Sequence, residues 1–207
     1  MKITKIKEDI TSEIASSFKD SIAIDTEATG LQIPERDKLS LIQVCDEKDN
    51  VFIIQPNKNN FEAPNLVSVL QNEEILKIGH FLRFDKNALE YFLKCKIKNI
   101  FDTKIASKIV RTYTDAHGLK NLVQEFCNKS IDKRYGSSDW NKDIDELTDK
   151  QLEYAANDVI YLHKIKRSLE KMLIRENRME LFKNCLSFLN TRVELDQKGF
   201  KEDIFEH

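Results

Sequence analysis

Residues 21–27 read SIAIDTE, and this stretch decides the fold class. Its apolar run, residues 22–24, predicts a strand that is buried on both faces. Asp25 and Glu27 follow at the end of that run. Because side chains alternate along a strand, both acids point to the same side of the sheet. Ligand sites of open α/β sheets lie at strand ends, so the stretch predicts a site here; an acidic strand end that faces water is the alternative.

Further elements extend outward from this strand. Apolar, β-branched runs predict four more strands, at residues 39–45, 51–55, 76–79 and 97–101. Apolar residues at helical spacing predict helices at residues 65–70, 86–92, 104–110, 119–127, 148–169 and 178–189. Strands first and helices after, with mixed strand pairing, predict an α/β or α+β layer fold whose five-stranded mixed sheet is flanked by helices.

The composition excludes several classes of protein. The chain has 207 residues with 5 Gly and 3 Pro, which excludes collagen-like and low-complexity chains. The net charge of −2 argues against tight, non-specific binding to long duplexes. No apolar run approaches the roughly 18 residues of a membrane span, so no membrane partner is expected. We expect a single domain over residues 1–207, with a C-terminal helix and tail, about residues 176–207, that offer contacts to another subunit.

The cysteines and the N-terminus predict the compartment. The four cysteines are widely spaced and form no CxxC pair, which argues against a zinc site. Buried, reduced thiols of a cytoplasmic protein are favoured over disulfides. The lysine-rich residues 1–9 are not followed by the apolar segment of a signal peptide. A cytoplasmic location is therefore expected.

Residues 154–158 read YAAND and lie within a strongly periodic predicted helix. Thr148 and Gln151 form a capping box that opens this helix. Tyr154 and Asp158, four residues apart, share one helix face. The alanines between them let the helix pack closely on a sheet. Asp158 lies near the buried stripe, where a carboxylate needs a partner, either a metal ion or a lysine or arginine.

A further acid, Asp85, ends the stretch HFLRFD at residues 80–85. It opens a predicted helix directly after a strand, so a helix cap is the stronger interpretation of Asp85 taken alone. Taken together, however, Asp25, Glu27, Asp85 and Asp158 could converge at one sheet edge. Clustered acids repel each other and take up protons or bind cations.

Such a cluster predicts a specific chemistry. Oxygen-only ligands suit Mg²⁺ or Mn²⁺ better than zinc. Two of these ions, about 4 Å apart, clamp the attacking and leaving oxygens of an in-line phosphoryl displacement. Tyr154 would then hydrogen-bond the attacking water.

Three motifs resemble the exonuclease motifs of the DEDDy branch of 3′→5′ exonucleases. They are residues 25–31 (DTEATGL), 80–85 (HFLRFD) and 154–158 (YAAND). Ser138, Asp139 and Trp140 are similar to a segment of the ribonuclease D group. A closer resemblance is to the nano-ribonuclease C family of short, bacterial, ribonuclease D-like enzymes. It is carried by residues 103–108 (TKIASK), 111–120 (RTYTDAHGLK) and 203–205 (DIF).

The resemblance implies a ribonuclease H-like exonuclease fold with a two-metal site. Two divalent cations, Mg²⁺ or Mn²⁺, would be held by four catalytic acids: Asp25, Glu27, Asp85 and Asp158. Tyr154 would place the attacking water. Leu31 matches the wedge that pushes between the last two bases. His80 matches a position near the terminal nucleotide, with Thr26 beside the substrate.

The resemblance also implies the substrate and the assembly. Enzymes of the nano-ribonuclease C family degrade very short RNAs, chiefly dinucleotides, and assemble as octameric rings. Short RNA and a homo-oligomer are therefore expected here. The chain ends soon after the nuclease motifs and is expected to lack the helical nucleic-acid-binding domains of full-length ribonuclease D. The arginine-proline-leucine that often follows Ser-Asp-Trp is also absent, and both departures put a tRNA-trimming role in doubt.

A dinucleotide-specific enzyme needs a group that caps the 5′ phosphate. A local cluster of donors suits this role: Lys104, Lys108, Arg111, Tyr113, His117 and Lys120. Arg111 is the leading candidate for phosphate contact, with Lys108 and Tyr113 beside it. A solvated helix face, or donors that face a neighbouring subunit, are the alternatives.

Three functions follow from these motifs. The first is a metal-dependent 3′→5′ exoribonuclease that hydrolyses very short RNA, chiefly dinucleotides, to nucleoside monophosphates. The second is a general ribonuclease D-like 3′→5′ exonuclease that trims longer RNA or DNA, which the net charge of −2 disfavours. The third is a catalytically dead binding or scaffold protein, which the presence of all four acids and the tyrosine disfavours. Metal dependence of turnover separates the third function from the first two.

Overall fold

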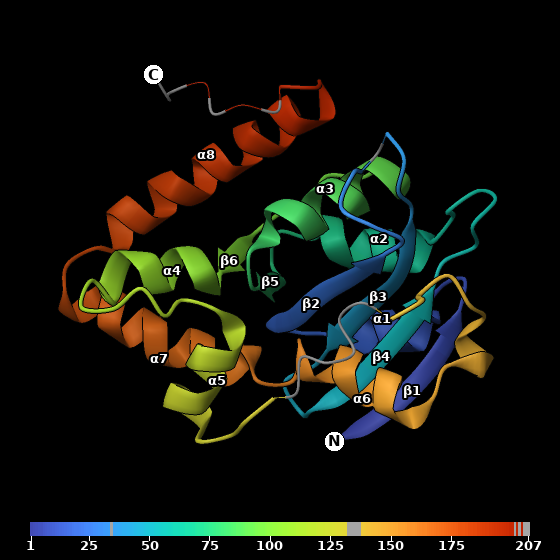
Figure 1. Ribbon diagram of the computed structural model, residues 1–207, viewed down its shortest axis with the longest axis horizontal. Coiled ribbons are helices and arrows are strands. Elements are labelled where there is room, and N and C mark those ends of the chain that lie inside the picture. The colour runs from blue at the N-terminus through green and yellow to red at the C-terminus, as the bar shows by residue number, and fades with distance from the viewer. Residues whose placement is uncertain (34, 132–137, 201, 203, 205–207) are drawn as a thin grey trace.

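A computed structural model of the chain contains a six-stranded sheet in the order β1-β4-β3-β2-β5-β6 (Figure 1). The structure describes residues 1–33, 35–131, 138–200, 202 and 204. Asp203 and Phe205 of the C-terminal motif lie outside the described residues.

The strand that decides the fold, β2 (Ser21–Ala28), lies inside this sheet. The other strands are β1 (Lys2–Lys7), β3 (Leu39–Cys45), β4 (Asn50–Gln55), β5 (Leu76–Gly79) and β6 (Ile100–Asp102). Strand β3 is antiparallel to both of its neighbours, β2 and β4. The pairs β1–β4, β2–β5 and β5–β6 are parallel. The mixed sheet of an α/β protein is therefore confirmed.

The sixth strand, β1, corrects the predicted count of five. Its sequence, KITKIK, has three exposed lysines and three half-buried residues, and no residue of it is fully buried. The strand lies at the edge of the sheet, where it pairs with β4 alone. Lysines are typical of such edges because they discourage pairing with another chain. A charged edge strand buries too little apolar surface to be predicted from hydrophobic pattern.

Helices cover both faces of the sheet. One face carries α1 (Ser12–Ser17), α2 (Pro64–Gln71) and α3 (Leu82–Phe92), which pack against Ile22 and Ile24 of β2. The other face carries α4 (Thr103–Val110), α5 (Leu119–Cys127), α6 (Asp149–Asn157) and α7 (Leu162–Arg175), which pack against Ala23. The last helix, α8 (Met179–Gln197), contacts α3, α4 and β6 and contributes to both cores. Strand β2 is thus buried on both faces, as predicted.

The helix predicted over residues 148–169 is two helices. Helix α6 ends at Asn157, Asp158 caps it, and α7 begins only at Leu162. Val159 and Leu162 are both buried, so the apolar stripe continues across the break and the spacing gives no sign of it. The break leaves Asp158 at a helix end that faces the sheet. Helix α8 also runs beyond the predicted residue 189, because Val193 extends its buried side.

The helices and thiols bear on two expectations from composition. Among the described residues, no helix combines the length and the apolar character that a membrane crossing requires. The four cysteines are free thiols, of which Cys45 and Cys95 are buried and the other two partly buried.

Candidate active site

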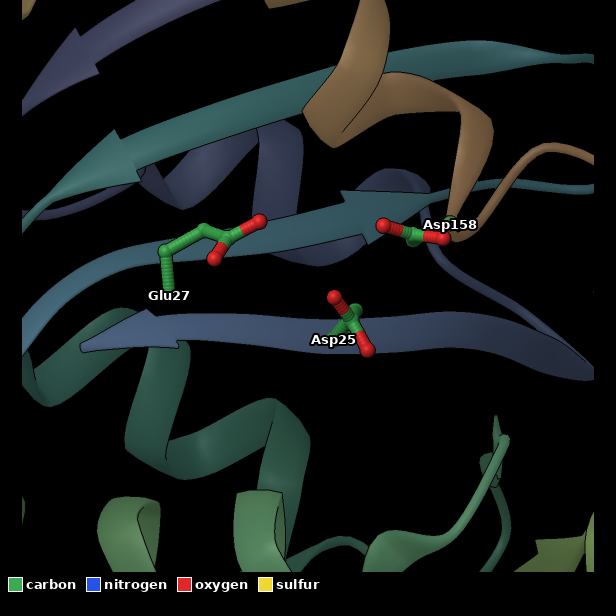
Figure 2. Close-up of side chains that lie close together, drawn as sticks. All are labelled: Asp25, Glu27 and Asp158. Atoms are coloured by element: carbon green, nitrogen blue, oxygen red, sulfur yellow. The ribbon is translucent and has the colours of Figure 1, made fainter. Parts of the chain in front are cut away.

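Three carboxylate side chains meet over one face of the sheet (Figure 2). Asp25 and Glu27 extend from β2, and Asp158 extends from the end of α6. One carboxylate oxygen of each residue lies within 4.8 Å of those of the other two. Asp25 and Glu27 are partly exposed, whereas Asp158 is buried. The structure therefore brings together three of the four acids that the sequence singles out.

Local sequence explains why these acids meet. Alternation along β2 places its two acids on the face that α4 to α7 cover. The capping box of Thr148 and Gln151 opens α6 over that face. Ala155 and Ala156 are fully buried, and their small side chains let the helix lie close to the sheet. Helix α6 then ends where Asp158 reaches the acids of β2.

The donor set of this group fits Mg²⁺ or Mn²⁺. All three ligand atoms are carboxylate oxygens, which hard divalent cations prefer, and no histidine or cysteine of the described residues joins the group. Three negative charges this close repel one another, and a cation would relieve that repulsion. The burial of Asp158 increases the cost of leaving its charge without a counter-charge. The acidic cluster is therefore compatible with metal binding.

Tyr154 lies one helical turn before Asp158 on α6. Its hydroxyl group donates a hydrogen bond to the Asp158 carboxylate. Burial, and then the negative charges of Asp158, Glu27 and Asp25, raise the pKa of Tyr154 well above its ordinary value. The phenol therefore stays protonated at neutral pH and acts as a hydrogen-bond donor rather than as a base. The Trp140 ring packs beside it, with ring centroids 6.0 Å apart.

Asp85 approaches β2 from the opposite face. Thr26 Oγ1 donates a hydrogen bond of 2.6 Å to Asp85 Oδ1, and both side chains are buried. Because Thr26 alternates with Asp25 and Glu27, its side chain points away from theirs and toward α3. Burial raises the pKa of Asp85 to about 7, and the Thr26 hydrogen bond partly opposes that rise. The metal-ligand role of Asp85 and the substrate contact of Thr26 thus stay predictions, since each side chain is committed to the other.

Leu31 stands at the surface in the segment that follows β2. Its side chain is 84% exposed. Asp37 braces this segment, because its carboxylate accepts a hydrogen bond of 2.8 Å from the Gln32 backbone N–H and pairs with Arg36. A Cβ atom at Gly30 would lie 2.4 Å from Asp37 Oδ2, so glycine is needed for this close approach. An exposed apolar side chain on a braced segment suits the predicted wedge, whose contact with bases stays a prediction.

A pocket of 370 Å³ adjoins Leu31. It is lined by Leu31, Gln32, Ile33, Glu35, Phe81, Arg83, Phe84, Asn87 and Asp196. The Phe81 ring is 47% exposed, and Lys104 Nζ lies 4.2 Å from its centroid. An exposed ring with a cation beside it can stack a nucleobase next to its phosphate.

His80 lies at the turn between β5 and α3. Its Nδ1 atom lies 2.9 Å from Thr103 Oγ1, and that hydroxyl donates to the Gly79 carbonyl at 2.9 Å. Because the hydroxyl proton is used, Nδ1 is the donor of the pair and the neutral ring has its lone pair on Nε2. The Asp102 carboxylate accepts hydrogen bonds from backbone N–H groups at the starts of both α3 and α4, which fixes the turn. Contact of His80 with a nucleotide stays a prediction.

Arg111 is buried, with 1% of its surface exposed. Its guanidinium donates to the Glu125 carboxylate, to Ser107 Oγ at 2.9 Å and to a backbone carbonyl at 2.8 Å. Tyr113 donates its hydroxyl to the same Glu125 carboxylate at 3.1 Å while its ring is 68% exposed. These bonds brace the segment between α4 and α5, and Lys108 is exposed beside it. Phosphate contacts of these donors stay predictions, and in this structure the guanidinium serves the fold.

Two buried polar residues around the site, Asp102 and Gln43, were not predicted from the sequence. Asp102 has a recognisable signal, since an aspartate directly before a predicted helix is a typical N-cap. Gln43 of β3 is fully buried and lies opposite Asp25 in the sheet. Its signal is weaker: one amide within an otherwise apolar strand.

Comparisons with known proteins agree with this geometry. A family model described as 3′-5′ exonuclease matches residues 3–174. DNA polymerase I of Aquifex aeolicus is 36% identical over 203 residues, which cover 88% of this chain and 32% of that protein. Ribonuclease D of Haemophilus influenzae is 34% identical over 159 residues, which cover 76% of this chain and 38% of that protein. The chain thus spans well under half the length of these curated relatives.

Solved structures extend the likeness over the whole chain. NrnC of Brucella melitensis bound to pGG is 42% identical, with a TM-score of 0.92 over 100% of this chain and 99% of that one. The same protein with bound Mg²⁺ gives a TM-score of 0.91 over 100% of both chains. RNase D of Escherichia coli, 24% identical, shares the fold with a TM-score of 0.76 over 88% of this chain and 47% of that one. These matches confirm the ribonuclease H-like fold and the predicted resemblance to nano-ribonuclease C.

Proposed function

The chain belongs to the 3′-5′ exonuclease family, and from this premise we propose that it hydrolyses very short RNA, chiefly dinucleotides, to nucleoside monophosphates. The observation that carries the proposal is the group of three carboxylates with oxygens within 4.8 Å of one another and the Tyr154 hydroxyl bonded to one of them. Such a group suits metal-assisted hydrolysis of a phosphodiester. The Mg²⁺-bound structure of a protein 42% identical to this chain supports the same assignment.

In the proposed reaction, Asp25, Glu27 and Asp158 hold two divalent cations, Mg²⁺ or Mn²⁺, with Asp85 as the candidate fourth ligand. When bound, such cations neutralise charge on the scissile phosphate and activate water. The Tyr154 hydroxyl group keeps its proton on the bond to Asp158, and its oxygen accepts a hydrogen bond from the attacking water. The water oxygen bonds to phosphorus, the bond to the 3′ oxygen of the preceding nucleotide breaks, and that oxygen takes up a proton. A nucleoside 5′-monophosphate leaves.

Three observations support a short substrate. The NrnC structure with a TM-score of 0.92 is bound to pGG. The 370 Å³ pocket beside Leu31 is at the small end of the range for ligand pockets, about 300–1,000 Å³. A net charge of −2 supplies little attraction for a long phosphate chain. We therefore place the terminal bases at the Leu31 wedge, with His80 and Phe81 beside them.

We further propose a homo-oligomer that works in the cytoplasm. Large apolar side chains remain exposed on α8 and just after it: Leu181 (55%), Phe188 (39%), Phe200 (53%) and Ile204 (50%). Apolar side chains gathered in this way suit contact with another copy of the chain, and an octamer is the assembly that the resemblance implies. The free thiols suit a reducing compartment.

A length series tests the proposed substrate. RNAs of two to ten nucleotides, labelled at the 5′ end, are incubated with the protein and Mn²⁺, and the products are resolved over time. Asp158→Asn is the inactive control, because an amide cannot replace a carboxylate ligand. We expect the dinucleotide to disappear at least tenfold faster than the longer strands.

The opposite outcome has an equally definite meaning. Stepwise shortening of every length at similar rates, or equal attack on DNA, would make the protein a general 3′→5′ exonuclease that trims longer RNA or DNA. The 36% identity to a DNA polymerase I makes DNA the necessary comparison in this experiment.

A further inference from the structure

Gln43 carries a buried amide that no side chain or backbone group of the described residues satisfies. Its side chain is fully buried in β3, and neither Nε2 nor Oε1 has a hydrogen-bond partner among those residues. Leu41 and Cys45, its neighbours on the same face of β3, are fully buried and apolar. Burying an amide without partners is costly, and most buried amides in proteins are satisfied. The Gln43 amide therefore needs a hydrogen-bond partner that becomes available when the acidic cluster is occupied.

The position of Gln43 identifies that partner. Gln43 is the direct cross-strand neighbour of Asp25. Opposite residues of an antiparallel pair project from the same face, with Cβ atoms about 4.5–5.5 Å apart. Figure 2 shows β3 as the ribbon beside β2, with the end of α6, which carries Asp158, close to it. The Gln43 side chain therefore projects from the same face of the sheet as Asp25, and α6 contacts β3 as well.

Gln55 of β4 shows how this chain satisfies a structural amide. It is also buried, but its Nε2 donates to the Lys142 carbonyl at 2.7 Å and its Oε1 accepts from the Ile144 N–H at 3.0 Å. Those two bonds tie the segment before α6 to the sheet. Gln43 has the same donors and acceptor and no such bonds among the described residues. This contrast points to a role for Gln43 in the site rather than in the fold.

We propose that Gln43 is a positioning residue of the metal centre, whose amide donates a hydrogen bond to the Asp25 carboxylate, directly or through one buried water, when cations are bound. The inference rests on the metal site of the proposed function. An amide N–H group can orient a carboxylate without adding charge. Residues that hydrogen-bond to a metal ligand in this way, without touching the metal, hold that ligand in place. A buried water with polar groups on both sides is the usual way to complete such a contact.

The test replaces the amide by an apolar side chain of similar volume, Gln43→Met. Mn²⁺ binding is followed through the fluorescence of Trp140, the single tryptophan, whose ring lies 6.0 Å from that of Tyr154. We expect Mn²⁺ to bind the variant about 10–100-fold more weakly than the wild type. We also expect the metal-free variant to melt at the same or a higher temperature, because no hydrogen bond within the chain is lost.

Two further variants make the result specific. Gln55→Met removes the hydrogen bonds to Lys142 and Ile144, so it should melt at a lower temperature and keep the wild-type affinity for Mn²⁺. Asp25→Asn removes a proposed ligand and should abolish binding.

Unchanged Mn²⁺ affinity in Gln43→Met overturns the proposal. A lower melting temperature of metal-free Gln43→Met also overturns it, because the amide would then stabilise the fold. Failure of both Gln43→Met and Gln43→Leu to fold has the same meaning. If wild type and Asp25→Asn give the same flat titration, the metal site itself is refuted, and the inference falls with it.

Discussion

At the scale of single residues, the Tyr154 hydroxyl group connects α6 to the acidic cluster. It bonds to Asp158, and burial together with three nearby acids raises its pKa. The charges that would hold cations therefore also keep the phenolic proton in place. The result is a phenolic oxygen held in a fixed place, where it can accept a hydrogen bond from the attacking water.

Replacing Tyr154 by phenylalanine should slow the chemical step and spare metal binding. Loss of one positioned proton-bearing group costs about a hundredfold or more in rate, so kcat is expected to fall by about 10²-fold. The Mn²⁺ affinity should stay at the wild-type value, because the three carboxylates remain. Single-turnover hydrolysis of a dinucleotide measures the first quantity and Trp140 fluorescence the second. A Tyr154→Phe variant as fast as the wild type would remove Tyr154 from the mechanism.

The residues of the site differ in how far sequence alone predicts them. Strand alternation, which is local, places Asp25 beside Glu27, whereas their meeting with Asp158 was a hypothesis from the combined motifs and the resemblance. The hydrogen bond between Thr26 and Asp85 forms because α3 packs on the face of β2 to which Thr26 points. The spacing of residues in the sequence does not show on which face α3 packs. The full burial of Gln43 is likewise a property of the folded sheet that one amide in an apolar run does not show. Contacts between distant elements are therefore predictable here only where recognisable motifs mark both partners.

At the scale of elements, the β5–α3 turn sets where His80 and Asp85 lie. A Cβ atom added to Gly79 would lie 2.1 Å from Leu82 Cδ2, inside the buried core. Gly79→Ala should therefore displace α3 and destabilise the protein by about 1–3 kcal/mol, together with a loss of activity. Thermal unfolding measures the first effect. Gly118→Ala is the control, because its Cβ atom would meet one side-chain nitrogen at 3.8 Å; an equal loss of stability in both variants would contradict this account.

A second element-scale prediction concerns the ion pair that joins α3 to α8. Arg83 holds both carboxylate oxygens of Asp196 at 2.8 Å, and Arg192 binds the same group at 2.9 Å. Burial alone would raise the pKa of Asp196, but the hydrogen bonds and charges of the two arginines outweigh it and lower the pKa below its ordinary 3.8. Asp196→Asn should cost about 1–2 kcal/mol, limited because Arg83 is 40% exposed.

The pH dependence of that cost follows from the sign of the shift. A lowered pKa gives stability that is present above 3.8 and is lost as the pH falls through the lowered value. The stability difference between wild type and Asp196→Asn should therefore shrink below about pH 4. Thermal unfolding of both proteins between pH 3 and pH 7 checks this. A difference that grows in acid would show that the carboxylate does not carry the contact.

Element boundaries were predictable where hydrophobic pattern and burial agree. Three elements have the predicted bounds: the strands at 39–45 and 76–79 and the helix at 119–127. Apolar residues extend over the length of each, in a run in the strands and at helical spacing in the helix. Strand β1 was not predicted because its lysines interrupt the apolar pattern of a half-buried edge strand. The break between α6 and α7 was missed because the apolar stripe crosses it. In both cases the deciding factor is the neighbouring element rather than the local pattern.

At the scale of the whole molecule, the exposed apolar face of α8 predicts self-association. For the octamer that the resemblance to nano-ribonuclease C implies, light scattering should give about 194 kDa, eight copies of the 24.2 kDa chain. Phe188→Asp places a charge on that face and should release smaller species. Asn190→Asp adds the same charge at an exposed polar position of the same helix and should leave the mass unchanged. A wild-type mass near 24.2 kDa at micromolar concentration would refute the oligomer.

The central claim is that the acidic cluster on β2 and α6 performs metal-dependent hydrolysis. The most direct measurement is release of nucleoside monophosphate from a dinucleotide by wild type and Asp25→Asn, each with Mn²⁺ and with a chelator. We predict release by the wild type with Mn²⁺, and none by the chelated wild type or by the variant under either condition. Release in the presence of chelator, or by Asp25→Asn at the wild-type rate, would contradict the claim.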